Sequence, residues 1–269
     1  MASVEVKDVS LENIIDLCLV CVPEEKRNDP DWQRGIEEKR TWAVKMLERI
    51  GSFAKVAYID ETPAGMIQYH PLPEQEVVEI DCIYVHEKRF WRKGAGNALL
   101  GALIEEMKKP IRWFENRPAK GLIVHPFPGE SEGQLSARDF FTHKGFKPVG
   151  DDPDLLFLSL QEGFVYQPKT KIPRNYQGQA EDKGRVLIFC GPNNCPAAYP
   201  FFLKRMERYI REVDSKVPID YVDISLEPDF VRKRNADYGD CVVNAKLIKA
   251  FVLDKDGFQE EVKTALKDS

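Results

Sequence analysis

The sequence contains no apolar run long enough to span a bilayer. Its first residues, MASVEVKDVS, have neither the basic region nor the apolar region of a signal peptide. The chain also lacks the basic excess typical of proteins that bind nucleic acids or anionic membranes, since its net charge is −5 at pH 7. We therefore expect a soluble, cytoplasmic protein that binds neither nucleic acid nor membrane.

Cysteine is scarce as well, with six residues in a chain of 269. This number is too small for a disulfide scaffold, so most of the thiols are expected to be reduced. Cys18 and Cys21 have CxxC spacing, but no second thiol pair lies nearby in sequence, and core packing is favoured over a metal site. The four histidines show no ligand spacing either, so no metal is expected.

The most informative stretch covers residues 77–107, with the sequence VVEIDCIYVHEKRFWRKGAGNALLGALIEEM. Its first nine residues are mainly β-branched and aromatic, which predicts a mostly buried strand. A charged loop and Gly94-Ala95-Gly96 follow, and apolar residues then recur at the spacing of one helical face. The stretch therefore predicts a strand, a glycine turn and a helix that begins at the glycines.

A helix that begins directly after a glycine turn leaves several backbone N–H groups unpaired at its positive end. Gly94 and Gly96 let the backbone approach a phosphate without a Cβ in the way, and Arg89, Arg92 and Lys93 add positive charge. The pattern predicts a site for a pyrophosphate. Taken alone, it also fits an ordinary helix start beside a solvated charge cluster.

The neighbouring segments predict an α+β layer of mixed strands. The expected strands cover residues 4–6, 53–59, 64–69, 121–124, 146–149 and 155–160, and the expected helices cover residues 11–18, 32–50 and 137–144. Ser10 is the expected cap of the first helix.

Two motifs in this order resemble the GCN5-related N-acetyltransferase (GNAT) family. RFWRKGAGNALL resembles the family's pyrophosphate loop and helix, and ARDFFTHKGFKPVG resembles its late helix and strand. The resemblance covers roughly residues 3–160 and implies the GNAT acyl-CoA N-acyltransferase fold. It also implies an enzyme that transfers an acetyl group from acetyl-CoA to a small-molecule or peptide amine by direct attack in a ternary complex.

In that family the fourth strand binds the pantetheine arm of the cofactor through backbone groups. Carried over, the resemblance implies cofactor-binding positions at Ile83, Tyr84, Val85, Arg92, Lys93, Gly94, Ala95 and Gly96. The chain departs from the family at Trp91, where Gln or Arg is usual.

A second departure is Phe141, which stands where many members have a tyrosine that protonates the leaving thiolate. The role of the acid is vacant or filled elsewhere. His143 is one alternative, although a surface histidine is the favoured interpretation. Because of Phe141, a second interpretation stays open, in which the protein is a non-catalytic binding or sensor protein for acyl-CoA or a thiol partner.

Acetyl transfer requires a neutral amine, yet an alkyl ammonium with a pKa of about 10.4 is rarely deprotonated at pH 7. In a regular strand Glu79, Asp81, Ile83 and Val85 share one face. Glu79 and Asp81 are therefore candidate catalytic bases that point the same way as the pantetheine positions. The alternative is a pair of solvated carboxylates that only attract a cationic substrate.

Residues 161–184 lack periodicity and predict a linker between a GNAT domain (1–160) and a second domain (185–269). The second domain is expected to contain strands at residues 186–189 and 219–224, a helix at 197–213, a hairpin in CVVNAKLIKAFVL and a last helix at 258–266. This order resembles a smaller thioredoxin-like α/β domain and is similar to the carboxy-terminal domain of YoaP-like acetyltransferases.

Three thiols are candidates for redox or metal chemistry in the second domain. Cys195 is expected at a helix start, where the dipole favours a thiolate, and Cys190, at a strand end, would resolve it. A reversible disulfide between them would serve redox sensing, or the domain would recruit a substrate. Cys241 would lie close to them. A decayed redox scaffold and soft-metal binding by the three thiolates remain open alternatives.

Overall fold

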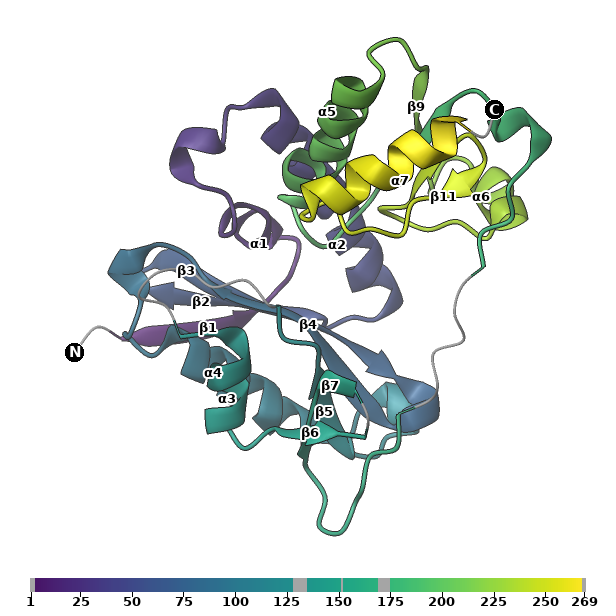
Figure 1. Ribbon diagram of the computed structural model, residues 1–269. Coiled ribbons are helices and arrows are strands. Elements are labelled where there is room, and N and C mark those ends of the chain that lie inside the picture. The colour runs from purple at the N-terminus through teal and green to yellow at the C-terminus, as the bar shows by residue number, and fades with distance from the viewer. Residues whose placement is uncertain (1–2, 128–134, 151, 169–174, 268–269) are drawn as a thin grey trace. The chain divides into compact units, whose positions relative to one another are not determined.

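The computed structural model describes residues 3–127, 135–150, 152–168 and 175–267 of the chain (Figure 1). Its backbone contacts divide the chain into two compact units. The first unit comprises residues 1–21 and 46–171, and the second comprises residues 22–45 and 172–269. The division differs from the expected domains because it assigns residues 22–45 to the second unit.

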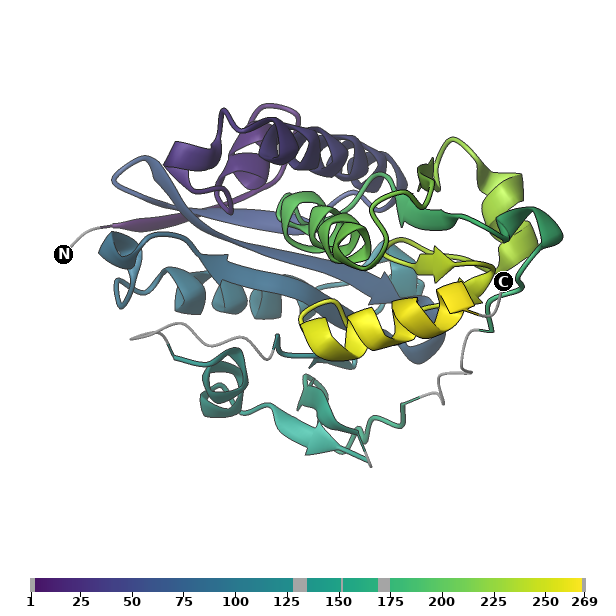
Figure 2. The same ribbon diagram turned by 45° about the horizontal axis from the view of Figure 1, so that its top comes forward.

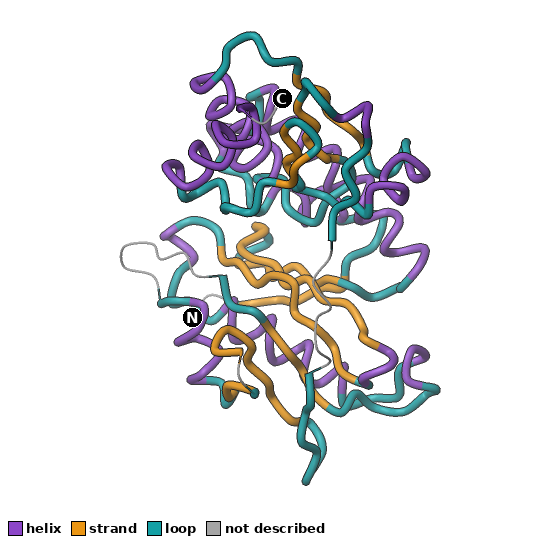
Figure 3. The backbone as a smooth tube through the Cα atoms, turned by 45° about the vertical axis from the view of Figure 1, so that its right-hand side comes forward, coloured by secondary structure: helices purple, strands orange, loops and turns teal. Residues whose placement is uncertain are grey.

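A seven-stranded sheet forms the centre of the first unit, in the order β1-β2-β3-β4-β5-β7-β6 (Figure 3). The strands are β1 (Val4–Asp8), β2 (Ala54–Ile59), β3 (Thr62–Leu72), β4 (Val77–Val85), β5 (Gly121–Val124), β6 (Lys147–Val149) and β7 (Asp152–Ser159). Every neighbouring pair is antiparallel except β4 and β5, which are parallel. A parallel pair requires a crossover, which contains helix α3 (Ala95–Met107).

The main core of the first unit lies between this sheet and helices α3 and α4 (Ala137–His143). Leu99 and Leu103 of α3 pack there against Ile80 of β4, as the helical spacing predicted. A smaller apolar cluster contains Val77 of β4 and Tyr166, from the segment after β7. Because Val77 and Ile80 belong to different clusters, both faces of β4 are covered by apolar side chains at this end.

The first two helices begin at residues other than the expected ones. Helix α1 (Ile14–Leu19) begins after Asn13, whose side chain accepts a hydrogen bond from the N–H of Ser10 at 2.8 Å. The prediction that Ser10 caps this helix was therefore wrong. Helix α2 (Pro30–Arg49) begins at Asp29-Pro30, because the Asp29 side chain accepts from the next turn and proline suits the first helical position.

The second unit contains a four-stranded sheet in the order β11-β10-β8-β9. Its strands are β8 (Val186–Cys190), β9 (Ile219–Asp223), β10 (Cys241–Val243) and β11 (Lys246–Leu247), and its helices include α5 (Lys204–Val213), α6 (Pro228–Arg234) and α7 (Lys255–Lys267). Strands β8 and β9 are parallel, whereas β10 is antiparallel to both β8 and β11. Helices α5 and α7 lie side by side (Figures 1 and 2). Helix α6 was not predicted from the sequence.

Much of the expected linker packs into the two units. Tyr166 is buried, and its ring stacks on Phe157 of β7. At the other end, the Tyr176 hydroxyl donates to Asp182, a fully buried carboxylate that also binds the buried guanidinium of Arg234. Residues 169–174 lie outside the described residues. In the described part of the chain, no helix is both long and apolar enough to cross a membrane.

Candidate functional site

Gly94 occupies the N-cap of helix α3 in the left-handed region, with φ of 92°. Only glycine adopts this conformation without strain, so the turn explains the residue type. A Cβ on Gly96 would lie 3.6 Å from the Phe140 ring, which is an ordinary contact. The fold therefore requires glycine at position 94 but leaves room at position 96.

The first N–H groups of α3 have no intrahelical acceptor, and the dipole places positive charge at this end. Arg92 and Lys93, immediately before the turn, are exposed, while Ala95 is buried. The sequence prediction placed an anion site at this turn. The local geometry has the two features that such a site requires, namely accessible cationic side chains and a helix start.

The Trp91 side chain connects this loop to the end of β4 through hydrogen bonds. Its indole N–H donates to the carbonyl oxygen of His86 at 2.7 Å, with a longer contact of 3.3 Å to the carbonyl of Val85. A side chain that departs from the family pattern thus holds the strand end and the turn together.

Strand β4 is paired differently along its two halves. It pairs with β3 through residues 77–85 but with β5 only through residues 77–80, opposite residues 121–124. Among the described strands, residues 81–85 of β4 therefore pair on one side only. An extended chain can add to such an edge through backbone hydrogen bonds.

The register of β3 and β4 shifts by one residue at Asp81. Tyr69 lies opposite Ile80 and Gln68 lies opposite Cys82, so that Asp81 is an extra residue in β4. An extra residue of this kind is a β-bulge, and it reverses the alternation of side chains beyond it.

The bulge corrects the prediction that four side chains of β4 share one face. Ile83 and Val85 pack against the α3 core together with Ile80, whereas Glu79 alternates with Ile80 and points away from that core. Glu79 and Asp81 do come together, since both contact His70 of β3. The two candidate bases therefore do not point the same way as Ile83 and Val85.

Glu79 and Asp81 belong to a chain of alternating carboxylates and imidazoles. His70 Nδ1 lies 2.9 Å from Asp81 Oδ1, and His70 Nε2 lies 3.8 Å from Glu79 Oε2. The other Glu79 oxygen, Oε1, lies 3.2 Å from His125 Nδ1. His125 Nε2 lies 3.6 Å from Asp152 Oδ2. We call these five residues the carboxylate–imidazole chain.

The electrostatics of the carboxylate–imidazole chain favour the charged forms of His70 and Asp152. Burial alone would lower the pKa of His70, but the hydrogen bond and charge of Asp81, with the charge of Glu79, outweigh burial and raise it. Arg49 opposes this effect. The pKa of Asp152 is lowered, chiefly by a hydrogen bond from the N–H of Asp154 and also by His125.

Sequence reasoning missed His70, His125 and Asp152. One signal was available, because His70 lies directly opposite Glu79 in the hairpin of β3 and β4. The positions of His125 and Asp152 depend on the neighbouring strands β5 and β7, whose register cannot be read from local patterns.

The family's acid has no counterpart at the two positions considered. Phe141 is 1% exposed, and its ring makes edge contacts with Phe140 and Phe146 in the core. His143 is exposed, and its Nδ1 lies 2.6 Å from the carbonyl oxygen of Asp139 on its own helix. His143 is thus the surface histidine that was expected.

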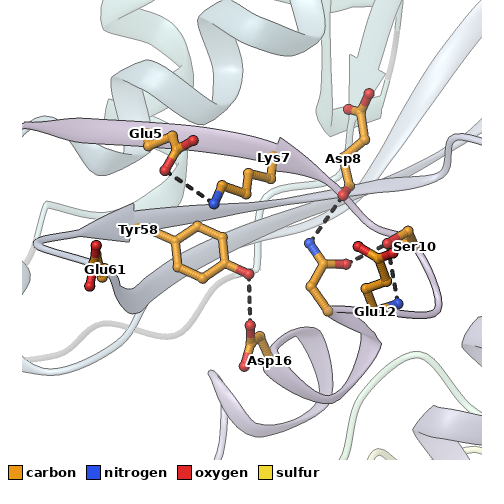
Figure 4. Close-up of a pocket in the computed structure, with 9 residues that line it drawn as sticks. Glu5, Lys7, Asp8, Ser10, Glu12, Asp16, Tyr58 and Glu61 are labelled. Atoms are coloured by element: carbon orange, nitrogen blue, oxygen red, sulfur yellow. Dashed lines mark hydrogen bonds and ion pairs between the residues drawn. The ribbon is translucent and has the colours of Figure 1, made fainter.

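Two surface depressions of the first unit, of about 550 and 480 Å³, lie elsewhere. The larger one is lined by Glu5, Lys7, Asp8, Ser10, Glu12, Asn13, Asp16, Tyr58 and Glu61 (Figure 4). Several of its side chains interact with one another. The Tyr58 hydroxyl donates a hydrogen bond to Asp16, and Lys7 forms an ion pair with Glu5. Neither depression includes Glu79 or the turn at residues 92–96, so neither marks the site described above.

The thiols of the second unit occupy different environments. Cys190, at the end of β8, and Cys241, on β10, are buried in the same apolar cluster. Cys195 is half-buried and its N–H donates to Asn193. Its carbonyl accepts from the N–H of Ala198, just before the π-helix Tyr199–Leu203 that leads into α5. Within the described ranges, no three His, Cys, Asp or Glu side chains are grouped to hold a metal ion.

Cys190 contacts residues from the segment that sequence analysis assigned to the other domain. Arg34 Nη2 lies 3.5 Å from the Cys190 sulfur, and Arg34 also pairs with Glu38. Burial raises the pKa of Cys190 to about 11, with Glu38 and Asp223 adding to the effect and Arg34 opposing it. Burial also raises the pKa of Cys241. Both are therefore neutral thiols at pH 7.

Residues 13–124 match the family model described as Acetyltransferase (GNAT) family. The chain therefore contains a GNAT-type N-acyltransferase domain. The match includes β4, the turn at Gly94 and α3, which are the elements that form the site. A search of the curated proteins found no match.

Solved structures that resemble this chain include the PaiA N-acetyltransferase of Thermoplasma acidophilum in complex with coenzyme A. It is 18% identical, with a TM-score of 0.42, and the match covers 58% of this chain and 99% of that one. Ard1 from Thermoplasma volcanium is 14% identical, with a TM-score of 0.42 and coverage of 59% and 99%. Naa50 of Arabidopsis thaliana, in complex with the bisubstrate analogue CoA-Ac-MVNAL, is 16% identical, with a TM-score of 0.39 and the same coverage. At these TM-scores the similarities carry no argument about activity.

Proposed function

We propose that the protein is an acetyl-CoA-dependent N-acetyltransferase that transfers the acetyl group to a primary amine by direct attack in a ternary complex. One observation carries the proposal. The half-paired end of β4, at residues 81–85, leads through a basic loop into the N-terminus of α3. The match of residues 13–124 to the GNAT family supports the same reaction class.

The proposed position of acetyl-CoA follows from these two elements. Its pyrophosphate would accept hydrogen bonds from the backbone of residues 92–96, beside Arg92 and Lys93. Its pantetheine arm would lie along residues 83–85 and pair with the backbone of Ile83 and Val85. Gly96 lies beside this path, because a Cβ on it would be 3.8 Å from Cγ2 of Val85.

We assign the role of the catalytic base to Glu79. It lies between two imidazoles, so its carboxylate has proton donors and acceptors on both sides. Asp81 is the second candidate, but its hydrogen bond to His70 gives it a different part, that of holding the imidazole in place. A positioned carboxylate of this kind takes the proton from the ammonium group before or during attack.

The leaving thiolate does not require the acid that the family pattern supplies. A thiol with an ordinary pKa of about 8.5 leaves as a far weaker base than an amine, and water can protonate it afterwards. This account agrees with Phe141 as a core residue. The same residue is the reason to keep a non-catalytic acyl-CoA-binding protein as the second candidate.

For the second unit we propose a thioredoxin-like domain that recruits a substrate or senses redox state. The strand order β11-β10-β8-β9 supports it, as do the parallel pair β8 and β9 and the intervening helix α5. Cys190 and Cys195 are the proposed redox pair. Cys241 is proposed to be a bystander, because its thiol is buried in the apolar cluster. We include residues 22–45 in this domain.

Calorimetry and a transfer assay distinguish the two candidates. An enzyme binds acetyl-CoA and forms a labelled amide with at least one amine of a panel of small amines and peptides. A binding protein takes up acetyl-CoA but forms no amide with any of them.

A further inference from the structure

We propose that His125 positions Glu79 and conducts the proton from it to Asp152, where the proton leaves to water. The inference rests on the proposed function, because it concerns the proton that Glu79 takes from the amine. His125 does not contact the substrate in this account. It acts through Glu79 and is therefore a positioning residue.

The exposure of the two carboxylates beside His125 indicates the direction of proton transfer. Glu79 is 26% exposed, whereas Asp152, at the other end of His125, is 47% exposed. His125 Nδ1 lies within hydrogen-bond distance of Glu79, at 3.2 Å. Within the described residues Nε2 is buried and makes no hydrogen bond, and it lies 3.6 Å from Asp152, so these two atoms must approach each other for the proton to pass. An imidazole with one nitrogen toward each of two carboxylates can pass a proton without rotating.

The proton balance closes without another reactant. Glu79 takes one proton from the substrate ammonium and becomes a neutral carboxylic acid. It gives this proton to Nδ1 of His125, whose Nε2 releases its own proton to Asp152. Asp152 then loses a proton to solvent and returns to its ionised form. The tautomer of His125 reverts when the ring exchanges protons with water, so each turnover exports one proton.

His70 supports the same direction from the other side of Glu79. The groups that face it are Asp81, Glu79 and Arg49, and their net effect raises its pKa. A higher pKa of His70 favours its protonated form, which attracts the carboxylates of Asp81 and Glu79. The ring of His125 faces Glu79 and Asp152, and Tyr166 also lies within electrostatic range of Glu79.

The test compares His125→Asn with the parent and with His143→Asn. Asparagine retains a polar group beside Glu79 but cannot relay a proton. We expect kcat at pH 7 to fall about 10-fold, less than the roughly 10²–10⁴-fold contribution of a general base. We also expect the loss to shrink toward pH 9, where hydroxide takes the proton. His143→Asn changes an exposed histidine on α4 and should reproduce the parent's profile.

Two further measurements keep the inference testable. If His125→Asn does not fold, Asp152→Asn, a change at a half-exposed side chain, should give the same pH dependence with a smaller loss. Asp154→Asn, at an exposed carboxylate two residues further along, is the control for this variant and should keep the parent's pH profile.

The outcomes separate this inference from the proposed function. If the parent acetylates no amine, the proposed function fails, and the inference fails with it. If the parent is active but the profile of His125→Asn overlays it, the inference alone is wrong and Glu79 passes its proton directly to water.

Discussion

His70 Nδ1 lies 2.9 Å from Oδ1 of Asp81, the residue that bulges out of strand β4. Because of this contact and the charge of Glu79, the pKa of His70 is raised despite its partial burial. The bulge therefore brings a carboxylate next to an imidazole whose protonated form is favoured, beside the candidate base Glu79.

Asp81→Asn should lower the pKa of His70, because the hydrogen bond loses its charged acceptor. A raised histidine pKa contributes stability below the unfolded value of about 6.5, and this contribution is lost as the pH rises through the folded pKa. The variant should therefore lose more stability at pH 5.5 than at pH 9, as measured by urea unfolding. An equal loss at both pH values would show that Asp81 does not act through His70. Asp154→Asn, at an exposed carboxylate paired with Arg138, is the control.

Glu79→Gln should lower turnover at pH 7 by about 10²-fold, since the amide cannot accept the ammonium proton. The loss should diminish at high pH, where the free amine is abundant. A pH–rate profile of kcat checks this expectation. If the variant's profile matches the parent's, Glu79 is not the base, and Asp81 or water must take that role.

Gly96→Val should weaken acetyl-CoA binding at least 10-fold while the protein remains folded. The reason is that a Cβ makes only ordinary contacts there, with Phe140 and Val85, whereas the added methyl groups of valine would lie beside Val85, where the cofactor is proposed to bind. The matched control is Gly101→Ala on the same helix, where a Cβ meets no atom within 4 Å. This control should raise stability by about 0.5–1 kcal/mol and leave the calorimetric affinity unchanged. Equal affinity of Gly96→Val and the parent for acetyl-CoA would show that the pyrophosphate does not bind at this turn.

Arg234→Met should destabilise the second unit by about 3–5 kcal/mol, because it leaves Asp182 buried without its charged partner. Burial alone would raise the pKa of Asp182, but hydrogen bonds from Arg234, the Gln179 N–H and Tyr176 lower it overall. The ionised Asp182 therefore stabilises the folded state fully above its unfolded pKa of about 3.9. This stabilisation is lost as the pH falls through the pKa of Asp182 in the folded state.

Hydrogen exchange of the core amides in β8 measures this effect within the full chain. Arg232→Met is the control, since its ion pair with Asp229 is exposed and should contribute at most about 1 kcal/mol. A loss as small for Arg234→Met as for the control would contradict the account of the buried pair.

Cys195 should react with iodoacetamide faster than Cys190, because burial raises the pKa of Cys190 to about 11. Mild oxidation with hydrogen peroxide should then join the two thiols, with release of two water molecules for each disulfide. Mass spectrometry of alkylated peptides checks both points. The redox role is excluded if the pair never forms and neither thiol reacts faster than the buried Cys18. Arg34→Met should slow the alkylation of Cys190 further, because the guanidinium opposes the rise of its pKa.

The sequence allowed β4, the turn at Gly94 and α3 to be predicted because each has a local cause: β-branched residues, a glycine at positive φ and a helical apolar stripe. The bulge at Asp81 has no local signal, and it changed which side chains of β4 share a face. Its position depends on how β3 and β4 align over their whole length.

The carboxylate–imidazole chain could not be predicted for a related reason. Its members come from four strands or strand ends, and only His70 and Glu79 are joined by a hairpin whose register can be anticipated. The contact of Arg34 with Cys190 was missed because residues 22–45 lie between two elements of the first unit in sequence but belong to the second unit. Local sequence patterns do not show that a segment between two elements of one unit belongs to the other unit.

The most direct test of the central claim is the transfer of labelled acetyl groups from acetyl-CoA to a panel of small amines and peptide amino termini, with Gly96→Val as the background control. The account predicts a labelled amide with at least one acceptor in the parent protein and a strongly reduced yield in the variant at the same acetyl-CoA concentration. The account would be contradicted if acetyl-CoA binds to the parent but no amine in the panel is acetylated at any pH between 6 and 9, which are about the limits set by histidine and thiol titration.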